Sequence, residues 1–321
     1  MIVAVGQRIY AMTGKREYRS ADVEWGVPSI DMTVCVGCRR CADVCPSFSL
    51  CLKDGKPSVV SDGVFGCLAC GHCMAVCPSG AVRVTGRGMT ADDVFPLPPA
   101  SARATTAALE GVLQARRSVR HYEDKPVEKA IINHLLAMSA SAPMGFPPSS
   151  VGVVVINGKE RVQELAKDLT AAFQKWLFLG TPVGSVVLRL MMDKPSVAMM
   201  RTFVLPVAKV IIEARKENRD LLFYDAPCVI LFHYPMKDTV DPTIACSFAT
   251  LAAETLGLGS CMIGTVPPAL QGDKKLKRKW GIPEKSFPSI AMTLGYPSVA
   301  FRNGIRRRFK SVEYVEQPGR T

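Results

Sequence analysis

Two short cysteine repeats decide the fold of the N-terminal part of this chain. Residues 35–46 read CVGCRRCADVCP, and residues 67–78 read CLACGHCMAVCP. Both follow the pattern C-x-x-C-x-x-C-x-x-x-C-P, in which three cysteines share one tight turn and the fourth precedes a proline. Zinc sites use four ligands, usually in two pairs, and do not need this spacing twice over. Disulfides between cysteines three residues apart would be strained, so the repeats favour ligation of a metal cluster.

The repeats resemble those of bacterial ferredoxins that carry two 4Fe–4S clusters. In that pattern the first three cysteines of one repeat bind irons of one cube, and the fourth cysteine binds the other cube. The resemblance therefore implies two sets of four ligands. The first set is Cys35, Cys38, Cys41 and Cys77, and the second set is Cys67, Cys70, Cys73 and Cys45.

The whole chain is too long to be a ferredoxin alone. It has 321 residues, 48% of them hydrophobic, which indicates two domains and a large core. Four of its 12 cysteines lie outside the repeats, mostly in apolar contexts, and we expect them to be buried and inert. These four are Cys51, Cys228, Cys246 and Cys261. Iron–sulfur clusters and unpaired cysteines are typical of a reducing compartment, which predicts a cytoplasmic protein.

The formal net charge of +12 indicates anionic partners. Part of it is expected to neutralise an anionic cofactor, and the remainder fits either docking to an acidic electron carrier or solubility alone. The basic residues are spread out and no recognition motif accompanies them, so no nucleic-acid partner is predicted. The N-terminus lacks the features of a signal peptide. No stretch reaches about 18 uninterrupted apolar residues, so no transmembrane segment is expected.

Composition shifts divide the chain into four parts. We expect an N-terminal extension, a cluster domain, a linker broken by glycine and stiffened by proline, and a helix-rich C-terminal domain. In that order they span residues 1–30, 31–85, 86–104 and 105–321. Residues 2–5 suggest a strand, Asp54-Gly55 predicts a hairpin turn, and residues 80–84 predict a strand that closes the cluster domain.

Helical and strand patterns alternate in the C-terminal domain. Helices are predicted at residues 106–116, 128–141, 161–173 and 243–256. Strands are predicted at residues 151–156 and 229–234, within 288–296, and as a shorter candidate at 312–315. Gly257 is expected to end the last helix. The pattern predicts an α+β domain with a sheet wrapped by helices. No G-x-G-x-x-G follows a strand, so a Rossmann domain for NAD is not expected.

Four segments of this domain carry chemistry-bearing patterns. They are R-R-S-x-R at residues 116–120, D-A-P at 225–227, LAAETLGLGSCMIG at 251–264, and L-G-Y-P at 294–297 with arginines after it. In this order they resemble the nitroreductase family of FMN flavoproteins, over residues of about 110–315. The resemblance implies an N-terminal ferredoxin-like two-cluster domain joined to a nitroreductase-like FMN domain. It also implies a homodimer with FMN at the subunit interface.

The resemblance further implies which residues bind the flavin. Arginine forks and a hydroxyl in the first segment suit a phosphate and the polar edge of the flavin ring. Backbone N–H groups of the third segment would approach flavin N5, where the small residues Gly257, Gly259 and Gly264 let the backbone come close to a flat ring. The implied cofactor-binding residues are Arg116, Arg117, Ser118, Arg120, Pro143, Met144, Gly145, Met262, Ile263, Gly264, Arg307 and Arg308.

Two departures from the family pattern concern the substrate side. Residues 142–150, APMGFPPSS, lack the Asn, Gln and Trp of many members and resemble a variant of ferredoxin-fused members. Pro143, Met144 and Gly145 are therefore implied by position only. A long, Met-rich insertion at residues 173–220 is expected to be helical. It has three candidate roles: packing on a dimer partner, a lid over the substrate, or a helix on a membrane surface.

The predicted function is an FMN-dependent oxidoreductase. It would take electrons through two 4Fe–4S clusters and reduce a small organic acceptor, such as a nitroaromatic, an activated alkene or a carbon–halogen bond. A ferredoxin or similar low-potential donor would replace or supplement NAD(P)H. The alternative is an electron-transfer module that passes electrons to a protein partner. No Ser-His-Asp set is visible, and no side chain is assigned a catalytic role.

Overall fold

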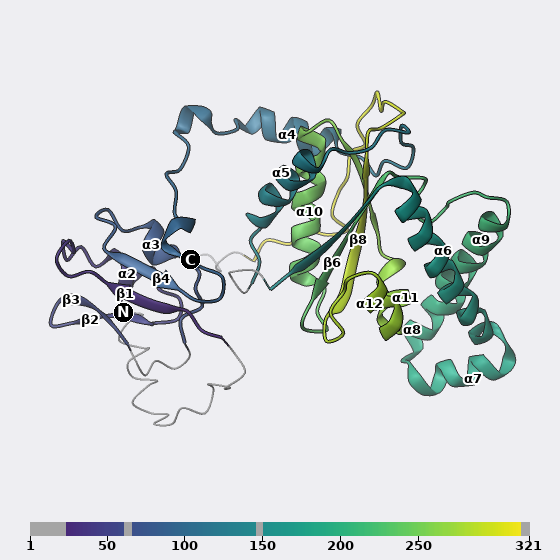
Figure 1. Ribbon diagram of the computed structural model, residues 1–321, viewed down its shortest axis with the longest axis horizontal. Coiled ribbons are helices and arrows are strands. Elements are labelled where there is room, and N and C mark those ends of the chain that lie inside the picture. The colour runs from purple at the N-terminus through teal and green to yellow at the C-terminus, as the bar shows by residue number, and fades with distance from the viewer. Residues whose placement is uncertain (1–23, 61–65, 146–149, 316–321) are drawn as a thin grey trace, which may run out of the picture. The chain divides into compact units, whose positions relative to one another are not determined.

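The structure is a computed structural model that describes residues 24–60, 66–145 and 150–315. The chain forms two compact units (Figure 1). The first comprises Met1–Arg103 and Pro143–Ser150, and the second comprises Ala104–Ala142 and Val151–Thr321. The strand expected at residues 2–5 lies outside the described residues.

Two small antiparallel pairs of strands build the first unit. β1 (Val27–Ile30) pairs with β4 (Val82–Thr85), so the sheet begins four residues before the boundary expected at residue 31. β2 (Leu50–Lys53) pairs with β3 (Lys56–Val59). The predicted hairpin turn between β2 and β3 is confirmed. Its two residues, Asp54 and Gly55, have φ angles of 51° and 76°, as a tight two-residue turn requires.

Each cysteine repeat continues into one short helix. α2 (Arg40–Asp43) belongs to the first repeat and α3 (His72–Ala75) to the second. After β4 the chain has two 3₁₀ turns, η1 (Ala91–Asp93) and η2 (Ala100–Ala102). The residues between these turns form no regular structure, as their prolines predict.

A four-stranded antiparallel sheet forms the centre of the second unit. Its order is β5-β6-β8-β7. The strands are β5 (Gly152–Asn157), β6 (Cys228–Tyr234), β7 (Gly259–Ile263) and β8 (Phe287–Gly295). Three of them confirm predicted strands. β7 was not predicted, because its glycine and serine read as part of a loop. Residues 312–315 form no strand and are exposed.

Helices cover both faces of this sheet (Figure 1). One face carries α4 (Thr106–Ala115), α5 (Lys129–Ala140) and α10 (Val240–Thr255). The other carries α6 (Lys159–Trp176), α11 (Val266–Gln271) and α12 (Lys274–Lys279). Side chains of α6 such as Leu165, Leu169 and Phe173 are almost fully buried against Val229 and Leu231 of β6. Removal of this apolar surface from water stabilises the layered α+β fold.

Gly257 ends α10, as predicted. Its φ angle is 70°, in the left-handed region. Leu258 N–H donates to the carbonyl of Ala253 at 2.8 Å, and Gly257 N–H donates to that of Glu254 at 3.2 Å. These two bonds form a Schellman motif, which turns the chain sharply from α10 into β7.

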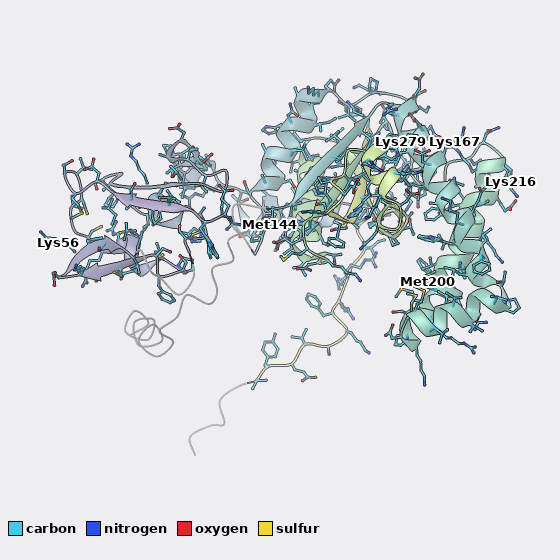
Figure 2. The ribbon with its side chains drawn as sticks, turned by 60° about the horizontal axis from the view of Figure 1, so that its bottom comes forward. Lys56, Met144, Lys167, Met200, Lys216 and Lys279 are labelled. Carbon is cyan, nitrogen blue, oxygen red and sulfur yellow. The ribbon has the colours of Figure 1, made fainter. Side chains whose placement is uncertain are left out.

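The insertion at residues 173–220 is helical. After the end of α6 it contains η3 (Leu177–Gly180), α7 (Pro182–Met191), α8 (Lys194–Met199), the π-helix η4 (Met200–Val204) and α9 (Leu205–Lys216). Met200 and Lys216, labelled in Figure 2, mark η4 and the end of α9. Within the described ranges, no helix is long and apolar enough to cross a membrane.

Candidate functional site

The two cysteine loops have the same backbone conformation. In the first, Gly37 and Arg39 have φ angles of 67° and 67°; in the second, Ala69 and Gly71 have 55° and 72°. Alternating left-handed and right-handed residues turn successive N–H groups toward one side of the chain, where they face negative charge. Both left-handed positions occur at equivalent places in the two repeats despite different side chains. The repeat therefore builds two equivalent concave loops, each carrying its own thiols.

The second set of cysteines comes together around one cavity. Cys67, Cys70 and Cys73 of the second repeat line it together with Cys45 of the first repeat. Burial and, to a smaller extent, the other three thiols raise the pKa of the Cys73 thiol to about 12. This is the grouping that the ferredoxin resemblance implies, with the fourth ligand crossing from the other repeat.

The first set is grouped in the same way. Burial raises the pKa of Cys41, and both Cys77 and Cys35 lie close enough to raise it further. Cys38 is exposed at the rim of this loop. The sulfur of Cys77 accepts a hydrogen bond from Ala81 N–H at 3.3 Å. Hydrogen bonds of this kind to cysteine sulfur tune the potential of iron–sulfur clusters.

A zinc ion and a 4Fe–4S cube require different arrangements of four thiolates. A zinc ion needs its four ligand atoms at the corners of one small tetrahedron. Among the described residues, no three His, Cys, Asp or Glu side chains converge on one ion in that way. A 4Fe–4S cube binds each thiolate to a different iron, so its sulfurs lie farther apart. All 12 cysteines lie within the described ranges and are free.

A basic cavity of about 860 Å³ lies in the second unit. Arginines from the R-R-S-x-R segment and from the C-terminal segment line it. The full lining is Leu113, Gln114, Arg116, Arg117, Ser118, Arg120, Phe301, Gly304, Ile305, Arg306 and Arg307. The structure therefore brings together two segments that lie far apart in the sequence, and their guanidiniums suit a phosphate.

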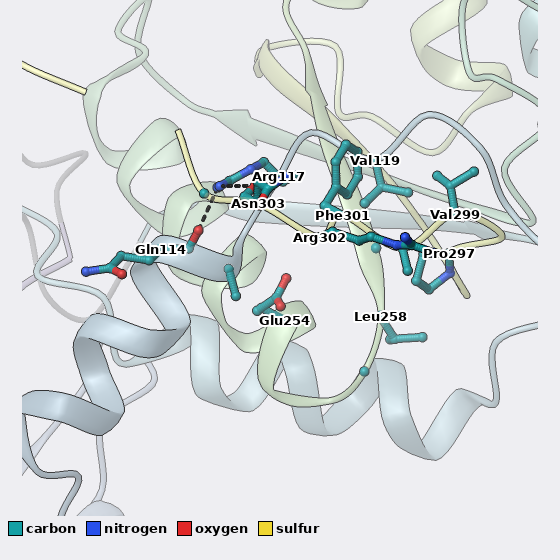
Figure 3. A pocket seen from close by; sticks show the side chains of 15 residues that line it. Gln114, Arg117, Val119, Glu254, Leu258, Pro297, Val299, Phe301, Arg302 and Asn303 are labelled. Atoms are coloured by element: carbon teal, nitrogen blue, oxygen red, sulfur yellow. Dashed lines mark hydrogen bonds between the residues drawn. The ribbon is translucent and has the colours of Figure 1, made fainter. Parts of the chain in front are cut away.

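Arg117 joins these two segments directly. Its guanidinium donates to the carbonyl of Gln114 at 2.7 Å and to that of Asn303 at 3.3 Å (Figure 3). It also donates to the carbonyl of Arg116 at 2.8 Å. Its Nε is buried and has no hydrogen-bond partner within the described part of the chain. Arg117 also lines an adjoining cavity of about 450 Å³, which Glu254 and Arg302 line as well. Most of the N–H groups of the Arg117 guanidinium thus donate to backbone carbonyls of the protein.

Residues of the segment 251–264 and of the R-R-S-x-R segment line a third cavity, of about 310 Å³. Met262 of β7 lines it together with Arg116 and Ser118. Ser247 and Thr250 of α10 contribute hydroxyl groups on the same side. Arg116 and Ser118 line both this cavity and the basic cavity. A ligand with an anionic group in the basic cavity could extend from there along β7 and α10.

The R-R-S-x-R segment is held on the edge of the sheet by β7. Val119 N–H donates to the carbonyl of Ser260 at 2.9 Å, and Ser118 forms a parallel bridge with Ser260. Gly259 makes this approach feasible, because a Cβ atom there would lie 2.7 Å from Cγ1 of Val119. The need for a small residue at Gly259 thus comes from packing against the protein. Close approach of this residue to a flat ring stays a separate prediction.

The D-A-P and L-G-Y-P segments also pack closely at a glycine, Gly295. A Cβ atom on Gly295 would lie 2.7 Å from Cδ of Pro227 and 2.9 Å from Cδ1 of Tyr122. The Tyr122 hydroxyl donates to the carbonyl of Val119 at 2.7 Å and lies 2.7 Å from Oγ1 of Thr293. Burial raises the pKa of Tyr122, which keeps the hydroxyl protonated. Glycine, proline and tyrosine therefore position the arginine segment.

The comparisons with known proteins agree with this geometry. Residues 113–296 match the model of the Nitroreductase family. The chain belongs to the nitroreductase family. Residues 27–78 match the model of the 4Fe-4S dicluster domain. The predicted fold class is thereby confirmed: an N-terminal ferredoxin-like domain precedes a nitroreductase domain of mixed helices and strands.

Individual relatives are distant. The FMN reductase (NAD(P)H) of Bacillus subtilis (strain 168) is 26% identical over 187 residues, which are 58% of this chain and 64% of that protein. The chain thus spans less than two thirds of that relative's length. Among solved structures, a nitroreductase with bound FMN from Bacteroides fragilis NCTC 9343 has a TM-score of 0.47 at 20% identity, covering 65% of this chain and 98% of that chain. A nitroreductase with bound FMN from Desulfitobacterium hafniense DCB-2 has a TM-score of 0.46 at 21% identity, covering 65% and 98%.

Some predicted cofactor residues are not brought into these cavities. In the nitroreductase domain, Ile263 at the end of β7 is buried in the hydrophobic core, and Arg308 is not among the lining residues. Gly264 is exposed, and a Cβ atom there would meet nothing within 4 Å. Pro143, Met144 and Gly145 belong to the other compact unit. Their roles toward the flavin stay predictions.

Sequence reasoning missed the polar residues of α10. Ser247 and Thr250 lie three residues apart in the middle of a largely apolar helix, so both face the same side of α10. That spacing was the available signal. Phe301 and Gly304 were missed as well, because they lie in an irregular segment whose path is set only by contacts such as that of Arg117 with Asn303.

Proposed function

We propose that this protein is an FMN-dependent oxidoreductase that receives electrons through two 4Fe–4S clusters and reduces a small organic acceptor. The observation that supports this most strongly is the basic cavity, where two arginine segments of a nitroreductase domain meet. It occurs in the same chain as two cysteine loops with equivalent backbones. The FMN reductase named above, a distant relative, supports the choice of flavin.

The residues of the basic cavity fit the phosphate end of FMN. Arg116, Arg307 and the exposed hydroxyl of Ser118 offer charged and neutral donors. Arg120 has a separate place, since its guanidinium lies against Tyr224 and donates to the carbonyl of Ser118 at 3.3 Å. We assign Arg116, Ser118 and Arg307 to the phosphate and Arg120 to the polar edge of the ring. When bound, FMN supplies the transfer of an electron pair as a hydride equivalent.

The chain's contribution to that chemistry is binding and electrostatics. Guanidiniums and backbone N–H groups that already point into a cavity stabilise negative charge without reorganising. Met262 gives the neighbouring cavity an apolar wall, while Ser247 and Thr250 offer hydroxyl groups to a polar chain such as ribityl. Together these residues would hold the cofactor with one edge charged and one face toward an acceptor.

The eight cysteines of the repeats would hold two cubes, which supply one-electron transfer. The buried Cys41 and Cys73 and the N–H donors around them would keep each cube partly shielded from water. We expect a ferredoxin or another low-potential carrier as the donor, replacing or supplementing NAD(P)H. We also expect a homodimer.

Anaerobic reduction experiments test this proposal. The full-length protein is purified anaerobically, and its flavin is extracted and identified by mass. The oxidised protein is then mixed with chemically reduced ferredoxin or with NADPH, and flavin absorbance is followed in a stopped-flow instrument. A nitroarene or a quinone is added to the reduced protein. We expect one FMN per chain, faster reduction by ferredoxin, and rapid reoxidation by the organic acceptor. Reoxidation no faster than in buffer alone would refute the reductase and favour transfer to a protein partner.

A further inference from the structure

The basic cavity carries more positive charge than one FMN phosphate requires. Five of its 11 lining residues are arginines, and none is Asp or Glu. A phosphate monoester brings a charge of about −2 at neutral pH. Arg116 and Arg307 match that charge, and Arg120 is assigned to the flavin ring. About two positive charges, those of Arg117 and Arg306, remain without an anion in the same cavity.

The protein does not neutralise this excess within the described ranges. The ion pairs among the described residues involve other side chains. No carboxylate of those residues therefore lies within 4.0 Å of the five guanidiniums. The hydrogen bonds that Arg117 donates go to neutral backbone carbonyls. Glu254 shares only the adjoining cavity, together with Arg117 and Arg302.

A second observation points to a further anion. The Nε of Arg117 is buried and has no partner in the described part of the molecule. A buried donor of a charged group without an acceptor is costly unless a ligand satisfies it. The cavity is also large, because about 860 Å³ lies near the upper end of the range for small-ligand sites. It has room for a cofactor phosphate and a second small group.

We infer that the acceptor reduced by this protein is itself an anion, a small molecule with a carboxylate or phosphate group beside its reducible group. This inference rests on the proposed function. Arg306, which the phosphate assignment does not use, is the residue we assign to the second anion, with Arg117 Nε contributing from the buried side. Bidentate arginine contacts suit both carboxylate and phosphate.

A matched set of nitroarenes tests the inference. 4-Nitrobenzoate and 4-nitrobenzamide have nearly the same shape but differ in charge, and 4-nitrophenyl phosphate separates phosphate from carboxylate. Binding of each compound to the oxidised, full-length holoprotein is measured by calorimetry, and reduction is measured separately with reduced ferredoxin as donor. We expect the anions to bind about tenfold more tightly than the amide at low salt, as one charge-assisted contact provides. The preference should shrink as salt screens the charges.

Variants locate the effect. Arg306→Ala should lower the anion-to-amide ratio of affinities several-fold, and Arg306→Lys should restore part of it. Lys310→Ala is the control, because Lys310 is an exposed cation that does not line the cavity. Equal affinity for 4-nitrobenzoate and 4-nitrobenzamide would overturn the inference while leaving the proposed reductase activity intact. An anion-to-amide affinity ratio that Arg306→Ala leaves unchanged would do the same. Tight anion binding without reduction of any compound would instead refute the proposed function and show that the anion site exists apart from it.

Discussion

The guanidinium carbon of Arg120 lies 5.6 Å from the centroid of the Tyr224 ring. Tyr224 has a φ angle of 59°, and Asp225 follows it with 55°, so two successive residues without glycine adopt the left-handed region. Such conformations cost on the order of 1–3 kcal/mol each and persist where the surroundings hold them. Here the Asp220 carboxylate accepts the N–H of Leu222 at 2.9 Å and holds the turn. The strained turn therefore presents an aromatic face to Arg120.

Replacement of Tyr224 should weaken flavin binding through Arg120. A cation–π contact contributes about 0.5–2 kcal/mol, so Tyr224→Ala should raise the Kd for FMN about two- to thirtyfold. Tyr224→Phe keeps the ring and should stay within about twofold of the wild type. Titration of FMN into flavin-free protein, followed by quenching of flavin fluorescence, measures both. If Tyr224→Phe weakened FMN binding as much as Tyr224→Ala, the contact between Arg120 and the ring would not be the cause of the weaker binding.

A methyl group at Gly259 should destabilise the nitroreductase domain. The added Cβ would lie 2.7 Å from Val119, so the arginine segment would have to move away from β7. Overpacking of this kind costs about 1–3 kcal/mol, and we expect a melting temperature several degrees lower together with reduced flavin content.

The matched control for that change is Gly111→Ala. Gly111 lies within α4, and a Cβ atom there meets nothing within 4 Å. Alanine is favoured over glycine in a helix by about 0.5–1 kcal/mol, so this variant should melt at the same temperature or slightly higher. Circular dichroism of anaerobic samples measures both variants. Equal melting temperatures for Gly259→Ala and Gly111→Ala would show that the contact with Val119 is not rigid.

Cysteine replacements should remove the clusters one at a time. Cys73→Ser changes a buried ligand of the second set and should lower the iron content from about eight to about four per chain, since each cube holds four. Cys51→Ser lies outside both sets and should leave about eight. Iron analysis and electron paramagnetic resonance of the reduced protein test this. About four irons in the wild type would mean that only one cysteine set binds a cluster.

Alkylation should distinguish the cysteines outside the repeats. Burial raises the pKa of Cys228 and of Cys246 to about 12. A raised pKa favours the unreactive thiol, so both remain protonated at pH 8 and even at pH 9, and thiolate appears only as the pH nears 12. Cys51 is only half-buried. Iodoacetamide should label Cys51 of the native anaerobic protein and spare Cys228 and Cys246, as read by peptide mass spectrometry. Labelling of Cys246 before unfolding would contradict its burial.

The cluster loops were predictable because their information is local. Spacing alone grouped Cys67, Cys70 and Cys73, and the ferredoxin pattern supplied the crossing ligand Cys45. The predicted burial of the four remaining cysteines is confirmed for Cys228, Cys246 and Cys261, whereas Cys51 is half-buried because it lies on β2, in a two-stranded pair. Their inertness stays a prediction.

The flavin side depended on contacts distant in sequence, which no local pattern reports. β7 exists because residues 259–263 pair with β8, and that pairing outweighs the low strand propensity of Gly259 and Ser260. The sequence predicted a small residue at Gly259 for approach to a flat ring, which stays a prediction, and did not predict its contact with Val119. Arg117 resembled a ligand-binding residue by motif, yet most of its donors meet the carbonyls of Gln114, Arg116 and Asn303.

The bond between Arg117 and Asn303 spans 186 positions of the chain. A ribosome therefore releases the cysteine loops and the first arginine segment long before the second arginine segment exists. The cysteines of both repeats are synthesised early in translation, whereas the basic cavity becomes complete only when Arg306 and Arg307 emerge. Cofactor loading in the cell would thus follow a set order, with metal insertion open during synthesis and flavin capture postponed until nearly the whole polypeptide has been made.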